Sequence, residues 1–87
     1  MLLRISGFET FQNADGRIER LPAKHSKKIQ LCMELLKTFE FDRLYSDSEV
    51  RDLLLNYVDD YAFVRRTLVD MGYLQRDRYC LEYKRIK

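Results

Sequence analysis

The apolar pattern of the chain changes its period once, at Gly72. Upstream of that residue, apolar side chains recur three and four positions apart, which is the spacing of helices with one buried side. Downstream, apolar and polar residues alternate, which is the period of a strand with one buried face. The pattern predicts a C-terminal antiparallel hairpin that turns at Asp77 and Arg78. The apolar positions of its two strands are Leu74, Leu81 and Tyr83.

Boundary signals place two helices before the hairpin. Ser46 and Glu49 form a capping box, in which each side chain accepts a hydrogen bond from the backbone N–H of the other. Asp59 or Asp60 caps the next helix, and both carboxylates complement the positive end of its dipole. Gly72 ends that helix, because the position after a helix favours a left-handed residue. The stripes that we expect to be buried are Val50, Leu53, Leu54 and Tyr57 in the first of these helices and Tyr61, Val64, Leu68 and Met71 in the second.

A further helix precedes these two, from near Ser26 to about Phe39, and residues 43–45 form a short extended piece after it. Its apolar surface is wide, which indicates burial on two sides. The predicted order is therefore helix, extended piece, helix, helix and hairpin. We expect a single domain, mainly α with a small antiparallel β-hairpin, of the winged helix-turn-helix type.

Residues 1–22 are predicted to form a lead-in segment, and the winged-helix-like domain to span residues 23–87. Asp15-Gly16 is a favourable hairpin turn, and Pro22 ends the segment. Four apolar side chains are expected to pack this segment onto the body, and they are Phe8, Phe11, Ile18 and Leu21.

Length and composition exclude several classes of protein. A chain of 87 residues makes one domain at most, and 46% hydrophobic residues beside 34% charged ones are typical of a folded chain. No segment approaches the roughly 20 apolar residues that a membrane span needs, and we expect no membrane partner and a cytoplasmic location. Cys32 and Cys80 are then expected to be reduced, buried thiols.

The net charge of +2 does not by itself indicate a nucleic-acid partner, but the charges are unevenly distributed. Residues 17–28 carry five bases against one acid, and residues 65–87 carry seven bases against three acids. Between them, residues 34–60 carry eight acids against three bases. Two explanations stay open: a molecule with two differently charged faces, or ordinary scatter of charge over the surface.

Two blocks of sequence stand out in the second and third helices. They read Tyr45-Ser46-x-x-Glu49-Val50 and Asp60-Tyr61-x-x-x-Arg65-Arg66-x-Leu68-Val69-Asp70-x-Gly72. Shorter motifs accompany them: Leu21-Pro22 before a basic stretch, Phe39-Glu40, Leu74-x-Arg76 and Tyr83. On these motifs the chain, over about residues 18–85, resembles the bacterial family catalogued as domain of unknown function 2087. The resemblance implies a domain associated with transcriptional regulators, alone or joined to a DNA-binding domain, and it implies no ligand.

Two positions depart from the pattern of that family. Arg51 stands where members often have asparagine, and Asp77-Arg78-Tyr79 stands where they tend to have glycine in the wing turn. Both departures leave the expected fold intact, but the resemblance does not carry over any contact that depends on the asparagine.

The leading hypothesis is DNA binding by the third helix and the wing. In a helix-turn-helix motif the second helix lies in the major groove, where arginine reads guanine edges or contacts phosphates. Asp59 and Asp60 oppose this hypothesis, because like charges repel phosphate. A structural alternative has Arg65 and Arg66 in ion pairs with acids such as Asp47, Glu49 and Asp70. The candidate DNA-binding residues are Lys28, Arg65, Arg66, Thr67, Arg76, Arg78 and Arg85.

A second hypothesis is a protein-interaction module without DNA contact, which pairs with itself or with another regulator domain. The wide first helix favours it, as do tyrosines on the wing, although tyrosines equally fill a small core. Catalysis is the poorest fit, because His25 is the single histidine and no spacing offers a metal ion four ligands. Three glycines form no phosphate-cradling loop. We expect no enzymatic activity and no cofactor.

Overall fold

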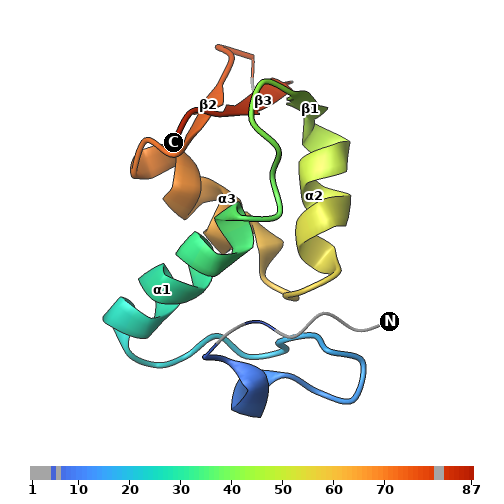
Figure 1. Cartoon of the computed structure of the whole chain (residues 1–87), viewed down its shortest axis with the longest axis vertical. Coiled ribbons are helices and arrows are strands. Elements are labelled where there is room, and N and C mark those ends of the chain that lie inside the picture. Colours follow the sequence, from blue (N-terminus) through green and yellow to red (C-terminus); the bar gives the residue numbers. More distant parts are fainter. Residues whose placement is uncertain (1–4, 6, 80–81) are drawn as a thin grey trace.

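Within residues 5, 7–79 and 82–87, which the computed structural model describes, the chain forms three α-helices and three short strands (Figure 1). The described residues of the lead-in segment, 5 and 7–22, lie at one end of the molecule, below α1 in Figure 1. Leu81 and Cys80, for which the sequence predicted buried positions, lie outside the described residues. In chain order the elements are the short 3-10 helix η1 (Glu9–Phe11), α1 (His25–Leu36), β1 (Leu44–Ser46), α2 (Asp47–Leu55), α3 (Tyr61–Asp70), β2 (Leu74–Arg76) and β3 (Glu82–Arg85).

The predicted capping box is present at the start of α2. The Ser46 hydroxyl accepts a hydrogen bond from the Glu49 N–H at 3.1 Å, and the Glu49 carboxylate accepts one from the Ser46 N–H at 3.0 Å. The bond from the Ser46 N–H lowers the pKa of the Glu49 carboxyl. At the start of α3, Asp60 is the cap, and it accepts a hydrogen bond from the Phe63 N–H at 3.2 Å.

Helix α1 ends earlier than the sequence pattern predicted. Its last residue is Leu36 rather than Phe39, because the backbone N–H groups after it donate to carbonyls three residues earlier instead of four. The Thr38 hydroxyl also donates to the Leu35 carbonyl at 2.6 Å. The Phe39 N–H donates to the Leu36 carbonyl at 3.0 Å. Phe39 is nevertheless buried, and its ring meets that of Tyr45 edge to face at 5.1 Å between centroids. Phe39 therefore reaches the core from the turn after α1, and not from the helix in which the sequence pattern placed it.

The sheet has three strands, where the sequence predicted a hairpin of two. Strand β3 lies in the middle and pairs antiparallel with β1 on one side and β2 on the other. Tyr83 of β3 lies opposite both Tyr45 and Arg76. Partners in register point to the same face of a sheet, so these three side chains share the face that contains the buried tyrosines. The extended piece predicted before α2 is thus the third strand.

The core joins α1, α2 and α3 to the sheet. Leu53, predicted to be buried, is half-buried and packs against this core. Met71, also predicted to be buried, is 39% exposed, because α3 ends one residue earlier and Gly72 turns the chain into β2 at a φ of +80°. The helix side chains that are almost fully buried in the core are Leu31, Cys32 and Leu35 in α1, Val50 and Leu54 in α2, and Val64 and Leu68 in α3.

A short parallel bridge between Ile18 and Val58 holds the lead-in segment to the body. The Ile18 N–H donates to the Tyr57 carbonyl at 2.6 Å. Phe8 and Ile18 are buried, as the sequence predicted. Phe11, which was expected beside them, is 41% exposed, because η1 packs it against the outer side of Phe8 at 5.9 Å between ring centroids.

The turn predicted at Asp15-Gly16 is present. The Asn13 N–H donates to the Arg17 carbonyl at 2.8 Å, and Gly16 adopts a φ of +80°. The Asn13 side-chain oxygen accepts hydrogen bonds from the N–H groups of Asp15 and Arg17 at 2.9 and 3.0 Å. Asn13 therefore organises this turn through its side chain as well as its backbone.

We expect Ser46→Ala to lower the free energy of unfolding by about 1 kcal/mol, because α2 loses the acceptor for the Glu49 N–H. Urea titration followed by circular dichroism measures the loss. Ser26→Ala, which removes an exposed hydroxyl from the first turn of α1, is the matched control. An equal loss in the two variants would contradict the role given to Ser46.

The Cys32 thiol lies in the core, and burial raises its pKa to about 11. Because the thiolate is the reactive form, we expect Cys32 to react slowly with an aromatic disulfide reagent in the folded protein and quickly in urea. The measurement uses Cys80→Ser, so that Cys32 alone reports. The free energy of unfolding should also fall as the pH rises above 9.0, because the unfolded chain loses this proton first. Rapid labelling of the folded protein would contradict the buried position.

Candidate nucleic-acid interface

Helix α3 has one buried and one exposed side. Val64 and Leu68 face the core, whereas Ala62, Arg66 and Asp70 are exposed. Because residues four apart lie on the same face of a helix, these three form one exposed row. The chain turns directly from the end of this row into β2.

A hollow of about 430 Å³ opens between α3 and β2. Arg65 and Arg66 line it from the helix, and Arg76 lines it from the strand. Asp70 is the single acid among the described residues that line it. We call this feature the arginine hollow, and its lining residues are Ala62, Arg65, Arg66, Val69, Asp70 and Arg76. Its three guanidinium groups suit an anion.

Arg65 is the best anchored of the three arginines. Its guanidinium donates a hydrogen bond to the Asp47 carboxylate at 3.2 Å, and it lies 5.5 Å from the centroid of the Tyr61 ring. The Tyr83 hydroxyl donates to the same Asp47 oxygen, also at 3.2 Å. One carboxylate at the start of α2 therefore contacts both α3 and β3. This is one of the ion pairs that the structural alternative proposed for Arg65.

Arg66 is held more loosely. Its Nε lies 3.9 Å from a carboxylate oxygen of Asp70, and the two side chains are 83% and 67% exposed. An exposed pair of this kind contributes about 0–1 kcal/mol, so it separates at little cost. Arg76 is also exposed, and its register opposite Tyr83 directs it to the face of the sheet that adjoins the hollow.

Lys28 and Thr67 do not line the arginine hollow. The Lys28 ammonium lies 5.7 Å from the centroid of the Phe63 ring. The Thr67 hydroxyl lies beside the Cys32 thiol and lowers its pKa slightly, against the larger effect of burial. Both contacts join α1 to α3, which gives these two side chains a role in helix packing.

Arg78 and Arg85 also do not line the hollow. Arg78 is exposed in the turn between β2 and β3. Arg85 donates a hydrogen bond to the Phe39 carbonyl at 3.0 Å and lies 4.1 Å from the centroid of the Phe41 ring. It therefore fastens the C-terminal strand to the loop after α1. Of the candidate residues, the hollow brings together Arg65, Arg66 and Arg76.

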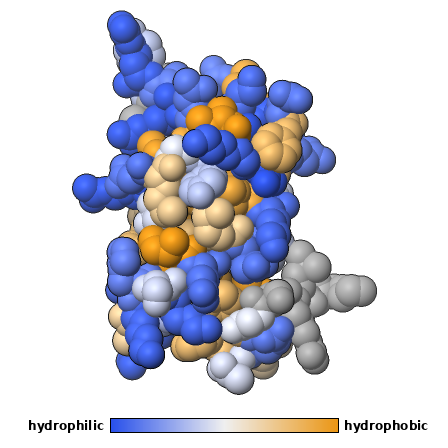
Figure 2. All heavy atoms as spheres, turned by 60° about the vertical axis from the view of Figure 1, so that its left-hand side comes forward, coloured by the Kyte–Doolittle hydropathy of each residue, from blue (hydrophilic) through white to orange (hydrophobic). Residues whose placement is uncertain are grey.

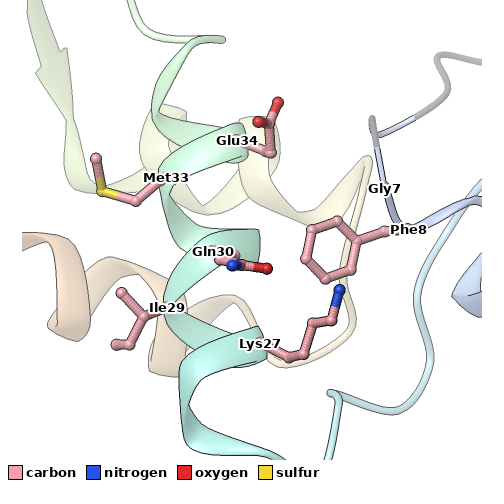
Figure 3. Close-up of a pocket in the computed structure, with 7 residues that line it drawn as sticks. All are labelled: Gly7, Phe8, Lys27, Ile29, Gln30, Met33 and Glu34. Carbon is pink, nitrogen blue, oxygen red and sulfur yellow. The ribbon is translucent and has the colours of Figure 1, made fainter.

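A second hollow, of about 340 Å³, separates the lead-in segment from α1 (Figure 3). Lys27 and Gln30 extend from the helix on the side of Phe8, and the Lys27 ammonium lies 5.5 Å from the ring centroid. Ile29 and Met33 point to the other side of the helix in this view. The second hollow therefore lies between the lead-in segment and α1, beside the contact of Lys27 with Phe8.

The Asp47–Tyr83 contact, next to Arg65, is one that the sequence did not predict. Alternation along the strand indicated an inward-facing Tyr83, but its partner lies 36 residues earlier in another element. No spacing rule relates two such positions.

Two other kinds of site are not found in the described part of the chain. Among these residues, no group of three or more His, Cys, Asp or Glu side chains is placed to hold a metal ion. None of the helices described is long and apolar enough to cross a membrane.

Comparison with known proteins identifies the family of the chain. A family model described as "Uncharacterized protein conserved in bacteria (DUF2087)" matches residues 17–85. No curated protein and no solved structure matches the chain. The matched region contains all three α-helices, all three strands of the sheet and the arginine hollow. The chain therefore belongs to the DUF2087 family of uncharacterized bacterial proteins.

Proposed function

We propose that the chain is a winged-helix domain that binds double-stranded DNA through α3 and the β2–β3 hairpin. The order helix, strand, helix, helix and hairpin supports the proposal, with α2 and α3 as the helix-turn-helix. In this arrangement α3 enters the major groove, and its exposed row faces the bases. The observation that carries the proposal is the grouping of three arginines where α3 meets β2.

The chemistry of these arginines supports contact with the DNA backbone and with bases. A guanidinium group forms two parallel hydrogen bonds with phosphate oxygens, or with the O6 and N7 atoms of guanine. Arg66 is the best suited to a base edge, because it stands on the exposed row and its pair with Asp70 is weak. Arg76, on the hairpin, is suited to the phosphate backbone beside the groove.

The two acids at the start of α3 are engaged in contacts of their own. Asp59 forms an ion pair with Arg17, and Asp60 caps the Phe63 N–H. These contacts and the positive end of the helix reduce the repulsion of phosphate. With phosphate contacts from Arg65 and Arg76, the slope of log affinity against log salt should be roughly −1 to −2, which is shallow for a DNA-binding protein.

We expect Arg66→Ala and Arg76→Ala each to weaken binding to duplex DNA about tenfold, and Arg76→Ala alone to reduce the salt slope by about 1. Fluorescence anisotropy at several salt concentrations measures both quantities. Lys84→Ala is the matched control, because it removes the same charge from an exposed position opposite Gln75 that does not line the hollow. Absence of DNA binding at low salt, or an equal loss in the control, would contradict the proposal.

A second candidate function is self-association without DNA contact, and exposed apolar side chains favour it. Phe41, Met71 and Ile86 are 55%, 39% and 44% exposed. Phe41 forms an isolated β-bridge with Arg85, the residue before Ile86. The Ile86 N–H donates to the carbonyl of Tyr73, two residues after Met71, at 3.0 Å. Backbone contacts therefore connect Ile86 to the neighbourhood of both Phe41 and Met71. Figure 2 shows apolar side chains gathered in the middle of one face, within a hydrophilic border. Such a face suits a second copy of the same chain in a two-fold dimer.

If this face forms a dimer, we expect Met71→Lys to convert it to a monomer, because a charge would lose its water in the interface. Sedimentation equilibrium measures the mass. Leu44→Lys is the matched control, since Leu44 is 60% exposed and lies opposite Lys84 on the other face of the sheet from Arg85. A wild-type protein that sediments as a monomer at high concentration would remove this candidate.

A further inference from the structure

The arginine hollow has an internal carboxylate partner that does not line it. Arg65 is 27% exposed, and its guanidinium reaches Asp47 at the start of α2. Arg66 and Arg76 are exposed at the same hollow. Arg65 therefore stands between a fixed carboxylate on one side and the hollow on the other.

Asp47 does not depend on Arg65 alone. The Tyr83 hydroxyl donates to the same carboxylate oxygen at 3.2 Å. Asp47 also lies in the first turn of α2, where the helix dipole stabilises a negative charge. Its side chain is 47% exposed and is hydrated as well. If Arg65 turned towards the hollow, Asp47 would keep these three sources of stabilisation.

We propose that the arginine hollow binds one phosphate group, and that Arg65 exchanges Asp47 for this phosphate on binding. Where the phosphate belongs to DNA, the inference rests on the proposed function and deepens it. A phosphorylated small molecule presents the same group and is the other source. Arg66 releases Asp70 in the same step, because their contact at 3.9 Å is weak. Asp47 is thus an internal competitor that holds Arg65 in place and lowers the affinity for phosphate.

The exchange predicts opposite effects on binding for a variant of Asp47 and a variant of Tyr83, which donates to it. Asp47→Asn keeps an acceptor for the Tyr83 hydroxyl and removes the charge that holds Arg65, so we expect DNA binding to tighten about threefold. Tyr83→Phe leaves Asp47 more dependent on Arg65, so we expect weaker binding. Asp52→Asn, an exposed site on the same helix that does not line the hollow, is the matched control and should have a much smaller effect. Thermal melting establishes that each variant is folded.

A second measurement uses inorganic phosphate and separates the two sources. At constant ionic strength, replacing chloride with phosphate should raise the melting temperature of the wild type, and raise it further in Asp47→Asn. Stronger stabilisation of Asp47→Asn than of Asp52→Asn by phosphate, without DNA binding, would support the hollow, overturn the DNA proposal and point to a phosphorylated small molecule, because phosphate stabilises folded proteins in general. Asp47→Asn that responds no more than Asp52→Asn, both to phosphate and to DNA, would overturn the exchange.

Discussion

Strand β3 pairs on both of its sides, and the rest of the structure depends on this double pairing. On one side Tyr83 lies opposite Tyr45, which brings the start of α2 to the C-terminal part of the chain. On the other side Tyr83 lies opposite Arg76, which aligns β2 with the end of α3. The two buried tyrosine rings then close the core, and the Tyr83 hydroxyl reaches Asp47.

The hydrogen bonds of Asp47 with Arg65 and Tyr83 supplement the small core next to the sheet. A domain of 87 residues buries few side chains that can fix how its helices are oriented. The Asp47 carboxylate accepts hydrogen bonds from Arg65 and Tyr83, which come from α3 and β3. One carboxylate oxygen therefore connects α3 to β3 and also positions one arginine of the hollow. Stability and the proposed binding site are linked through this atom.

Fewer basic residues meet at the arginine hollow than their number in the sequence suggests. Seven bases in residues 65–87 left open a molecule with two differently charged faces or ordinary scatter of charge over the surface. Arg65, Arg66 and Arg76 share one hollow, but Arg85 binds a backbone carbonyl and an aromatic ring of its own chain. Charge along the sequence thus overstates the proposed interface, because a guanidinium group also serves to connect parts of a fold.

The sequence by itself determined the features that arise within a few residues of one another. The capping box of Ser46 and Glu49, a cap of α3 at Asp59 or Asp60 and the turn at Gly72 are of this kind, since a helix end depends on its nearest neighbours, and the structure places that cap at Asp60. Only the tertiary structure decided that residues 44–46 pair with β3, that Asp47 meets Tyr83 and that the arginine hollow forms. These contacts join residues that are far apart along the chain, and their geometry follows from packing the whole core, which no local pattern encodes.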